Sequence, residues 1–362
     1  MHRAAILLPA LLVGGWSPLP LSAQEAPEPT PEEIVEDWLA SSHAHAMSEA
    51  FRHWDAEGEI PGACATCHST PGFVDYVASP MATVGVIDHP VPTGTVVTCT
   101  ACHDPAAAQL QSVPFPSGQS ASLENGSTVC TVCHQGRASG ASVETAVTGM
   151  EDDRVSTDLG FINIHYAAAA ATLMGSEAGG GYEYEGKSYA GRIAHVPDLS
   201  DCASCHDPHE TTIEIEDCTT CHAGVTDLRA IRTSLADFDG DGDTAEGIGM
   251  VTQQMQNRLL DGITLYATEI AGTPIIYAED AFPYFFADLN ADGRADPDEA
   301  MRDNRYASWT PRLLRAAYNY QFVTKDGGAF AHNPHYTLQL LIDSLQDLST
   351  VVSLDTEGLT RP

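Results

Sequence analysis

The chain has 362 residues, of which 50 are acidic and 16 are basic, so its formal net charge at pH 7 is -34. This charge repels nucleic acid and anionic lipid, which excludes both as partners, and it favours cations and basic proteins. Aromatic residues make up only 7% of the chain, so we expect prosthetic groups to supply part of the apolar bulk of the interior.

The N-terminus has the pattern of an export signal. A basic start precedes the apolar run 4–13, and residues 21–23 (Leu-Ser-Ala) offer a small-residue cleavage site. The apolar run is too short to span a bilayer, and no other stretch approaches about 18 uninterrupted apolar residues. We therefore predict a signal peptide at residues 1–23, an exported protein in the periplasm or outside the cell, and no stable membrane span. Residues 24–31, rich in Pro and Glu, are predicted to form a disordered lead-in.

Five copies of Cys-x-x-Cys-His follow, and they use every cysteine of the chain. The motifs are Cys64, Cys67 and His68; Cys99, Cys102 and His103; Cys130, Cys133 and His134; Cys202, Cys205 and His206; and Cys218, Cys221 and His222. This pattern is typical of covalent c-type haem attachment, in which two thiols add to the haem vinyl groups and the histidine binds the iron. Disulfides are the alternative for ten cysteines in an exported chain, but they give the five adjacent histidines no role.

The motifs define a predicted pentahaem domain over residues 32–223, with short helices, loops and little regular structure. The spacing between successive motifs is uneven, which argues against a simple tandem repeat. The longest spacing contains residues 179–189 (Gly-Gly-Gly-Tyr-Glu-Tyr-Glu-Gly-Lys-Ser-Tyr), which predict two strands around a glycine turn.

Haem iron takes two axial ligands, and each motif supplies one. Besides His2 and the motif residues, nine histidines remain, namely His43, His45, His53, His89, His165, His195, His209, His332 and His335. Nine exceed the five that are needed, so the chain can complete bis-histidine ligation by itself. Its eight methionines are the alternative sixth ligands.

Residues 224–362 carry no haem motif and are predicted to be a helical region with calcium loops. Helical patterns cover residues 248–270, 311–323 and 334–348, and Asn333-Pro334 supplies an N-cap and a first-turn proline for the last of these. The predicted fold class is therefore mostly α and irregular.

One loop of this region matches the EF-hand calcium pattern in full. Oxygen donors occupy positions 1, 3, 5, 9 and 12, position 7 contributes its backbone carbonyl, and Gly293 allows the sharp turn. These residues are Asp288, Asn290, Asp292, Arg294, Asp296 and Glu299. An acidic turn without an ion is the alternative.

A second acidic loop, earlier in the chain, begins in the same way but has Ile248 at its twelfth position. Glu246, two residues earlier, can supply the final carboxylate in a shortened loop. The predicted ligands are Asp237, Asp239, Asp241, Asp243 and Glu246. The chain is thus expected to bind one or two Ca²⁺ as structural clamps.

Several segments resemble multihaem c-type cytochromes of bacterial respiratory and extracellular electron transfer. They are residues 42–44 (Ser-His-Ala), 51–55 (Phe-Arg-His-Trp-Asp) with the first motif, 135–137 (Gln-Gly-Arg), 163–166 (Asn-Ile-His-Tyr), 207–209 (Asp-Pro-His) and 331–336 (Ala-His-Asn-Pro-His-Tyr). The resemblance ranks the distal ligands in the order His43, His165, His195 and His332, then His53 and His209, with His89 in reserve and His45 and His335 as bystanders. Six strong candidates for five places mean that one is in excess or serves a neighbouring subunit.

Three functions fit this sequence. The first is a non-enzymatic electron carrier with five haem c groups, whose partners are redox proteins or extracellular electron acceptors. The second is a multihaem reductase similar to the nitrite reductases, which keep one iron open and typically use Cys-x-x-Cys-Lys there; this chain has no such motif. The third elaborates the first, with copies of the chain polymerised into a filament that acts as a haem wire.

Overall fold

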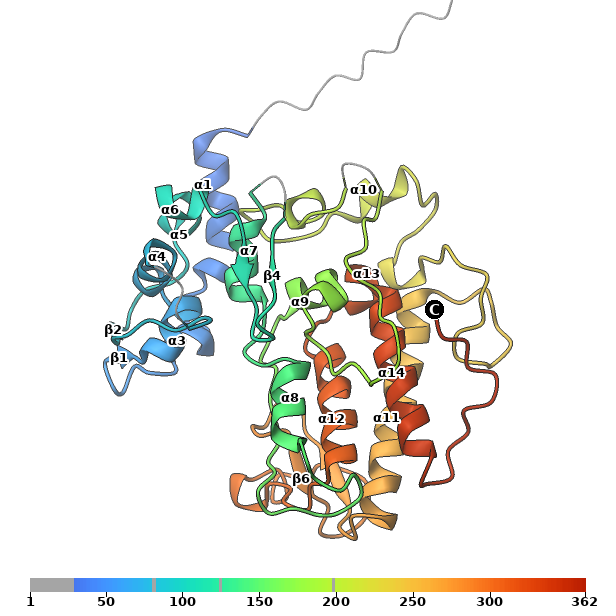
Figure 1. Cartoon of the computed structure of the whole chain (residues 1–362). Coiled ribbons are helices and arrows are strands. Elements are labelled where there is room, and N and C mark those ends of the chain that lie inside the picture. Colours follow the sequence, from blue (N-terminus) through green and yellow to red (C-terminus); the bar gives the residue numbers. More distant parts are fainter. Residues whose placement is uncertain (1–28, 80–82, 124–125, 197–198) are drawn as a thin grey trace, which may run out of the picture.

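The computed structural model describes residues 29–79, 83–123, 126–196 and 199–362. The predicted signal peptide and most of the predicted lead-in lie outside these ranges. Figure 1 shows short helices on one side of the molecule and the long helices α11, α12 and α14 side by side on the other. Within the described ranges, no helix combines the length and apolarity needed to cross a bilayer.

The first half of the chain is built from short elements. Its α-helices are α1 (Pro31–Ala40), α2 (Glu49–Arg52), α3 (Gly62–His68), α4 (Thr70–Ala78), α5 (Cys99–His103), α6 (Pro105–Ala108), α7 (Thr128–His134), α8 (Gly140–Val147) and α9 (Ala169–Met174). Two-stranded antiparallel pairs join β1 (Glu59–Ile60) to β2 (Val91–Pro92) and β3 (Val113–Pro114) to β4 (Ser120–Ala121). Short 3₁₀ turns are η1 (Ser42–Ala44) and η2 (Gly175–Glu177).

The second half begins with η3 (Cys202–Ser204), α10 (Ile215–Thr219) and η4 (Leu228–Ala230). It continues with α11 (Ile248–Glu269), the antiparallel pair β5 (Ile275–Tyr277) and β6 (Phe285–Ala287), η5 (Arg302–Asn304), α12 (Pro311–Thr324), α13 (Ala329–His332) and α14 (Pro334–Ser349). The three helices predicted for this region are confirmed to within one residue at each end.

Local sequence explains where the last two long helices begin. The Thr310 side chain accepts from the backbone N–H of Leu313, and Pro311 occupies the first turn of α12. The Asn333 side chain accepts from Tyr336 N–H in the same way, with Pro334 in the first turn of α14. Each cap satisfies one of the free N–H groups at a helix start. Proline, which has no N–H, loses no helical hydrogen bond in the first turn. The predicted cap of α14 is confirmed.

The two strands predicted around residues 179–189 are absent from this described segment. Its backbone groups bond to buried side chains instead of to a partner strand. Gly181 N–H donates to the Tyr336 hydroxyl at 3.0 Å, and the Asn319 amide both accepts from Tyr182 N–H at 2.7 Å and donates to its carbonyl at 3.0 Å. A side chain at Gly181 would overlap Leu340, so the glycine run lets the chain lie directly on α12 and α14.

Two apolar cores hold the molecule together. A small core lies among β1, α3, α4 and α7, and includes Ile60, Phe73 and Tyr76. A large core joins the faces of α11, α12 and α14 to residues from α8 and α9, such as Val143 and Met174. The predicted boundary at residue 223 separates the haem motifs from the motif-free stretch, but the large core extends across it.

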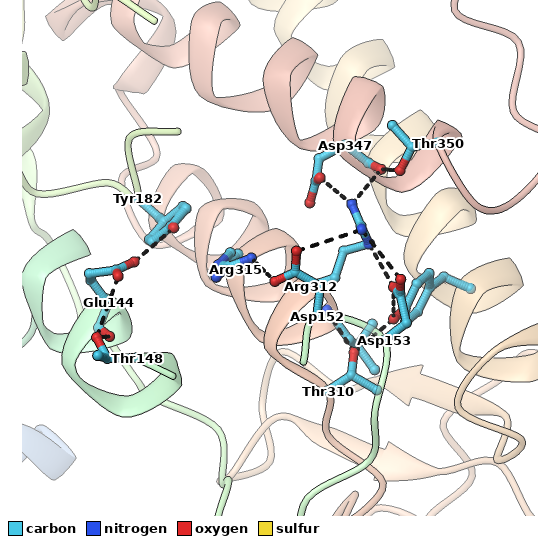
Figure 2. A network of polar contacts seen from close by, with 12 residues as sticks. Glu144, Thr148, Asp152, Asp153, Tyr182, Thr310, Arg312, Arg315, Asp347 and Thr350 are labelled. Carbon is cyan, nitrogen blue, oxygen red and sulfur yellow. Dashed lines mark hydrogen bonds and ion pairs between the residues drawn. The ribbon is translucent and has the colours of Figure 1, made fainter. Parts of the chain in front are cut away.

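A network of ion pairs fastens the segment after α8 to the long helices (Figure 2). Arg312, largely buried on α12, donates to Asp153 at 2.7 Å and to Asp347 of α14. Arg315 donates to Asp152 at 2.6 Å. Burial raises the pKa of Asp347 in spite of the nearby arginines. The positive charge of Arg312 therefore offsets part of the free energy that is needed to keep this carboxylate ionised.

Candidate haem and calcium sites

The attachment motifs lie on short helical turns. In α3, α5 and α7 the motif histidine is the last residue of the helix, while the fourth and fifth motifs begin in η3 and α10. Residues three apart share one face of a helix, so in α3, α5 and α7 both thiols of the motif point to the same side and the histidine follows next to them. All ten cysteines are unpaired, so the structure contains none of the disulfides considered as the alternative.

Each of the five motif histidines has the ring of one non-motif histidine opposite it. The structure therefore brings together residues that are far apart in sequence, including segments on both sides of residue 223. The pairs, with the distances between ring centres, are His68 with His165 (5.9 Å), His103 with His209 (6.3 Å), His134 with His43 (6.4 Å), His206 with His332 (6.3 Å) and His222 with His195 (6.1 Å).

These separations match the space that one metal ion needs between two imidazoles. A bond of about 2.0 Å from metal to ring nitrogen, with about 1.1 Å more from that nitrogen to the ring centre, places two trans rings about 6 Å apart. The five pairs therefore fit axial ligation of an iron by both histidines.

The paired residues include five of the six strongest distal candidates. The sixth, His53, packs its ring against Trp54 at 4.8 Å and bonds to Glu49 at 2.8 Å on the surface. His89 bonds to the carboxylates of Asp88 and Asp75. His45 and His335 are exposed. None of these four faces a motif histidine among the ring contacts of the described residues.

Hydrogen bonds at Nδ1 orient several of the paired rings. The Nδ1 of His68 lies 2.7 Å from the carbonyl of Ala50, and that of His134 lies 2.9 Å from the carbonyl of Ala167. Such a bond fixes the tautomer and leaves Nε2 as the metal-binding nitrogen. Burial and the neighbouring His68 lower the pKa of His165 to about 4, which favours the neutral imidazole that binds metal.

The motifs themselves are neighbours in space. Cys67 Sγ lies 4.0 Å from the Val132 carbonyl, and Cys133 Sγ lies 3.9 Å from the Thr66 carbonyl, so the first and third motifs are in contact. A hydrogen bond to Cys67, burial, and then Cys102 and Cys130 raise the pKa of the Cys133 thiol, which places the second motif nearby as well.

The fourth motif joins the third to the fifth. A hydrogen bond from Cys130 lowers the pKa of Cys202 to about 7, so the third and fourth motifs touch. Burial and then nearby Cys218 raise the pKa of Cys205, so the fifth motif lies next to the fourth. Thioethers formed at these sulfurs would not titrate, and the proximity of the sulfurs would bring haems attached to them close together.

Two charged residues beside the paired histidines carry no sequence signal and were not predicted. Lys325 is buried, with its ammonium 4.2 Å from the ring centre of Tyr166 and 4.3 Å from that of Tyr284. Asp326 is buried too, and both of its oxygens lie 2.9 Å from Nδ1 of His332. Burial acts to raise the pKa of Asp326, but the charge and hydrogen bond of His332 outweigh it and lower the pKa. No motif or spacing marks either residue.

In the acidic loop before α11, three carboxylates converge. Oxygens of Asp237, Asp239 and Asp241 all lie within 4.8 Å of one another. Burial and then Asp239 raise the pKa of Glu246, which shows that the carboxylate predicted to close the shortened loop faces the cluster. Oδ1 of Asp239 and Oε1 of Glu246 are buried and accept no hydrogen bond. Asp243 instead accepts from the backbone N–H of Ala245.

The loop that matches the full EF-hand pattern has a related arrangement. Asp288 and Glu299, its first and twelfth positions, are only 6% and 3% exposed. One oxygen of each accepts backbone N–H groups, from Gly293 and Leu289 respectively. The other oxygens, Oδ1 of Asp288 and Oε2 of Glu299, are buried without a partner. Gly293 has φ +74°, the left-handed conformation expected at the sharp turn.

The chain is similar to two C-type polyheme cytochromes of Geobacter sulfurreducens. It is 25% identical to OmcC over 382 residues, which cover 86% of this chain and 46% of OmcC. It is 25% identical to OmcB over 371 residues, which cover 82% of this chain and 45% of OmcB. The chain thus spans less than half the length of these relatives. No family model matches it, and no solved structure matches it.

The attachment motifs and this similarity together support a multihaem c-type cytochrome. The mostly helical and irregular architecture agrees with the predicted fold class.

Proposed function

We propose that this protein carries electrons through five covalently bound c-type haems, each held between its motif histidine and one distal histidine. The distal ligands in this proposal are His165, His209, His43, His332 and His195, for the first to the fifth motif in that order. The observation that supports it best is the occurrence of five separate histidine pairs, all at a spacing of about 6 Å that suits one metal ion.

The haem supplies a one-electron change between ferric and ferrous iron. The residues of the chain hold the groups close together, because neighbouring motifs touch through Cys67 and Cys133 and through Cys130 and Cys202. Hydrogen bonds at Nδ1 also orient four of the ten paired imidazoles, those of His68, His134, His206 and His332, which helps to keep their ligation the same in the two oxidation states. Short distances and constant ligation are what an electron carrier requires.

The reductase alternative needs an iron with one open position. In this structure every motif histidine is paired, and the sequence has no Cys-x-x-Cys-Lys motif. Both features favour the carrier. The net charge of -34 suits a basic redox protein or a metal cation as partner, and the export signal predicted from the sequence would place the protein in the periplasm or outside the cell.

The proposal is tested by intact mass and electron paramagnetic resonance of the matured protein. We expect a mass that exceeds the processed polypeptide by five haems, and ferric signals that are all low-spin. His165→Gly should convert one-fifth of the iron to high-spin, whereas His53→Gly should leave the spectrum unchanged. Four or fewer haems, or a large high-spin signal in the unaltered protein together with nitrite turnover, would overturn the carrier in favour of the reductase.

We further propose that the two acidic loops bind Ca²⁺ as structural clamps. The orphaned buried oxygens of Asp288 and Glu299 in one loop, and of Asp239 and Glu246 in the other, support this proposal, because a buried carboxylate oxygen without a partner is costly. A hard cation with oxygen ligands removes that cost. The loop of Asp239 and Glu246 is also tied to the C-terminal segment, because Arg258 donates to the carbonyls of both Asp239 and Asp355.

A further inference from the structure

His332 differs from the other paired histidines in its Nδ1 partner. The motif histidines His68, His134 and His206 have backbone carbonyls at Nδ1. His332 has the carboxylate of Asp326, with both oxygens at 2.9 Å. Among the hydrogen bonds of the described residues, this is the one that joins a carboxylate to a paired ring.

The surroundings keep Asp326 available to His332. The residue follows the end of α12 and is 4% exposed, so water does not screen it. Its Oδ1 accepts from Gly328 N–H at 3.1 Å, and the Thr172 hydroxyl bonds to the carboxylate as well. The adjacent Lys325 points elsewhere, towards Tyr166 and Tyr284, and donates to the Glu279 carbonyl.

We propose that Asp326 is a positioning residue that lowers the reduction potential of the haem on the fourth motif. Its carboxylate pulls the Nδ1 proton of His332 towards itself and makes the imidazole a stronger donor at Nε2. A stronger and more negative ligand stabilises ferric over ferrous iron. This inference rests on the proposed ligation of that haem by His206 and His332.

The first haem has the opposite environment. Arg137 donates its backbone N–H to the carbonyl of Ile164, next to His165, at 2.9 Å, and the Lys325 ammonium lies 4.2 Å from the ring centre of Tyr166 on the other side of that histidine in sequence. Positive charge near an iron stabilises its more reduced and less positive state. We therefore place the potential of the fourth haem below that of the first.

The fourth motif lies near both the third and the fifth motif, so the potential of its haem affects electron exchange with the haems on either motif. Its two cysteines neighbour the third motif through Cys130 and the fifth motif through Cys218. A low potential at the fourth haem makes electron transfer onto it from a neighbouring haem of higher potential an uphill step, so Asp326 slows exchange through this haem.

The test compares Asp326→Asn with Glu49→Gln in redox titrations followed by the haem absorbance. Asparagine keeps an acceptor for His332 but removes the charge, so one component with one-fifth of the amplitude should shift upwards. We expect at least a tenfold gain of ferrous over ferric iron at fixed potential, which corresponds to about 59 mV for one electron. Glu49 also bonds a histidine, His53, but that ring faces no motif histidine, so the control should not shift.

A second variant covers the case in which Asp326→Asn fails to mature. Thr172→Val, nearly isosteric at a fully buried position, removes a donor from Asp326 and should shift the same component downwards. Unchanged potentials in a variant that retains five low-spin haems would overturn the inference and leave the carrier proposal intact. An unaltered protein without five low-spin haems would overturn the carrier proposal itself.

Discussion

The haem-bearing and the motif-free parts of this chain reach a folded state by different means. Helices α11, α12 and α14 have 22, 14 and 16 residues and bury continuous apolar faces against one another. The motif helices α3, α5 and α7 have 7, 5 and 7 residues. Isolated helices shorter than about 12–15 residues are marginal in water, so tertiary packing must hold the motif helices in place.

That packing is supplied only in part by protein. The small core around Ile60 and Phe73 is the apolar cluster available to α3, α4 and α7, and most attachment cysteines are partly or fully exposed. Porphyrins attached there, as proposed above, would cover those surfaces and add apolar contacts. The two regions would then differ in the source of their apolar mass, which is side chains in one and the cofactor in the other.

Removing the haems should unfold the motif helices and leave the long helices folded, and this is the largest effect that we expect. In a variant with all ten cysteines changed to serine, amides of α3, α5 and α7 should lose nearly all protection from hydrogen exchange. Those of α11, α12 and α14 should keep theirs, and α8 should too, because Val143 belongs to the large core. Equal protection of the motif helices with and without haem would show that the protein core suffices.

The Arg312 network should contribute the next largest effect, within the motif-free region. Arg312→Met leaves Asp347 with its pKa already raised by burial and without its arginine. The loss of one partner from a buried ion pair costs about 3 kcal/mol of unfolding free energy. Denaturant unfolding followed by far-ultraviolet circular dichroism measures it.

The matched control for this change is Arg154→Met. Arg154 pairs with Glu151 at 3.8 Å, and both side chains are more than 70% exposed. An exposed pair contributes about 0–1 kcal/mol, so this variant should unfold almost like the original. Similar decreases in the free energy of unfolding for both variants would show that the buried network contributes no more than an exposed ion pair.

Calcium should stabilise the motif-free region by an amount close to that of the network. An ion that binds only the folded state at 100 times its dissociation constant contributes about 2.7 kcal/mol. Chelator should therefore lower the melting temperature while the covalent haems remain. Glu299→Gln should abolish most of that response at its loop, and Asp298→Asn, an exposed neighbour, should keep it. If chelator affects neither melting nor the haem spectrum, the loops are acidic turns only.

Sequence reasoning succeeded where the signal is local. The capping residues Thr310 and Asn333, the prolines after them and the apolar periodicity define α12 and α14 closely. The prediction that Glu246 closes the shortened acidic loop is also local and stays a prediction, although the charge of Asp239 acts on the pKa of Glu246. The attachment motifs contain their whole chemistry within five residues.

It failed where the determinant is a distant side chain. Asn319 and Tyr336 satisfy the backbone that was predicted to form two strands, and neither residue is adjacent to it in sequence. The pairing of each motif histidine with its partner depends on tertiary packing, so the sequence offered six ranked candidates but assigned none of them to a particular motif. Asp326 and His332 are only six residues apart, but no motif marks the contact that the short helix α13 brings about between their side chains.

The smallest effect we expect is a pH dependence at Asp153, which ties the segment after α8 to α12. Burial acts to raise the pKa of Asp153, but hydrogen bonds from Arg312 and Tyr266 outweigh it, and the pKa lies below its usual 3.8. A lowered pKa in the folded state means that the ionised carboxylate stabilises the fold above about pH 4, and that this contribution is lost as the pH falls through the folded pKa.

Compared with Asp153→Asn, the original protein should therefore be more stable by about 1 kcal/mol near neutral pH, since a charge-assisted bond is weakened by partial exposure. This advantage should be constant from pH 7 to pH 5 and should shrink below about pH 3.8. Glu151→Gln, a change to an exposed carboxylate in the same turn, provides the baseline. Denaturant unfolding at several pH values measures the difference, and an advantage that persists undiminished below the folded pKa would show that Asp153 acts through packing and not through its charge.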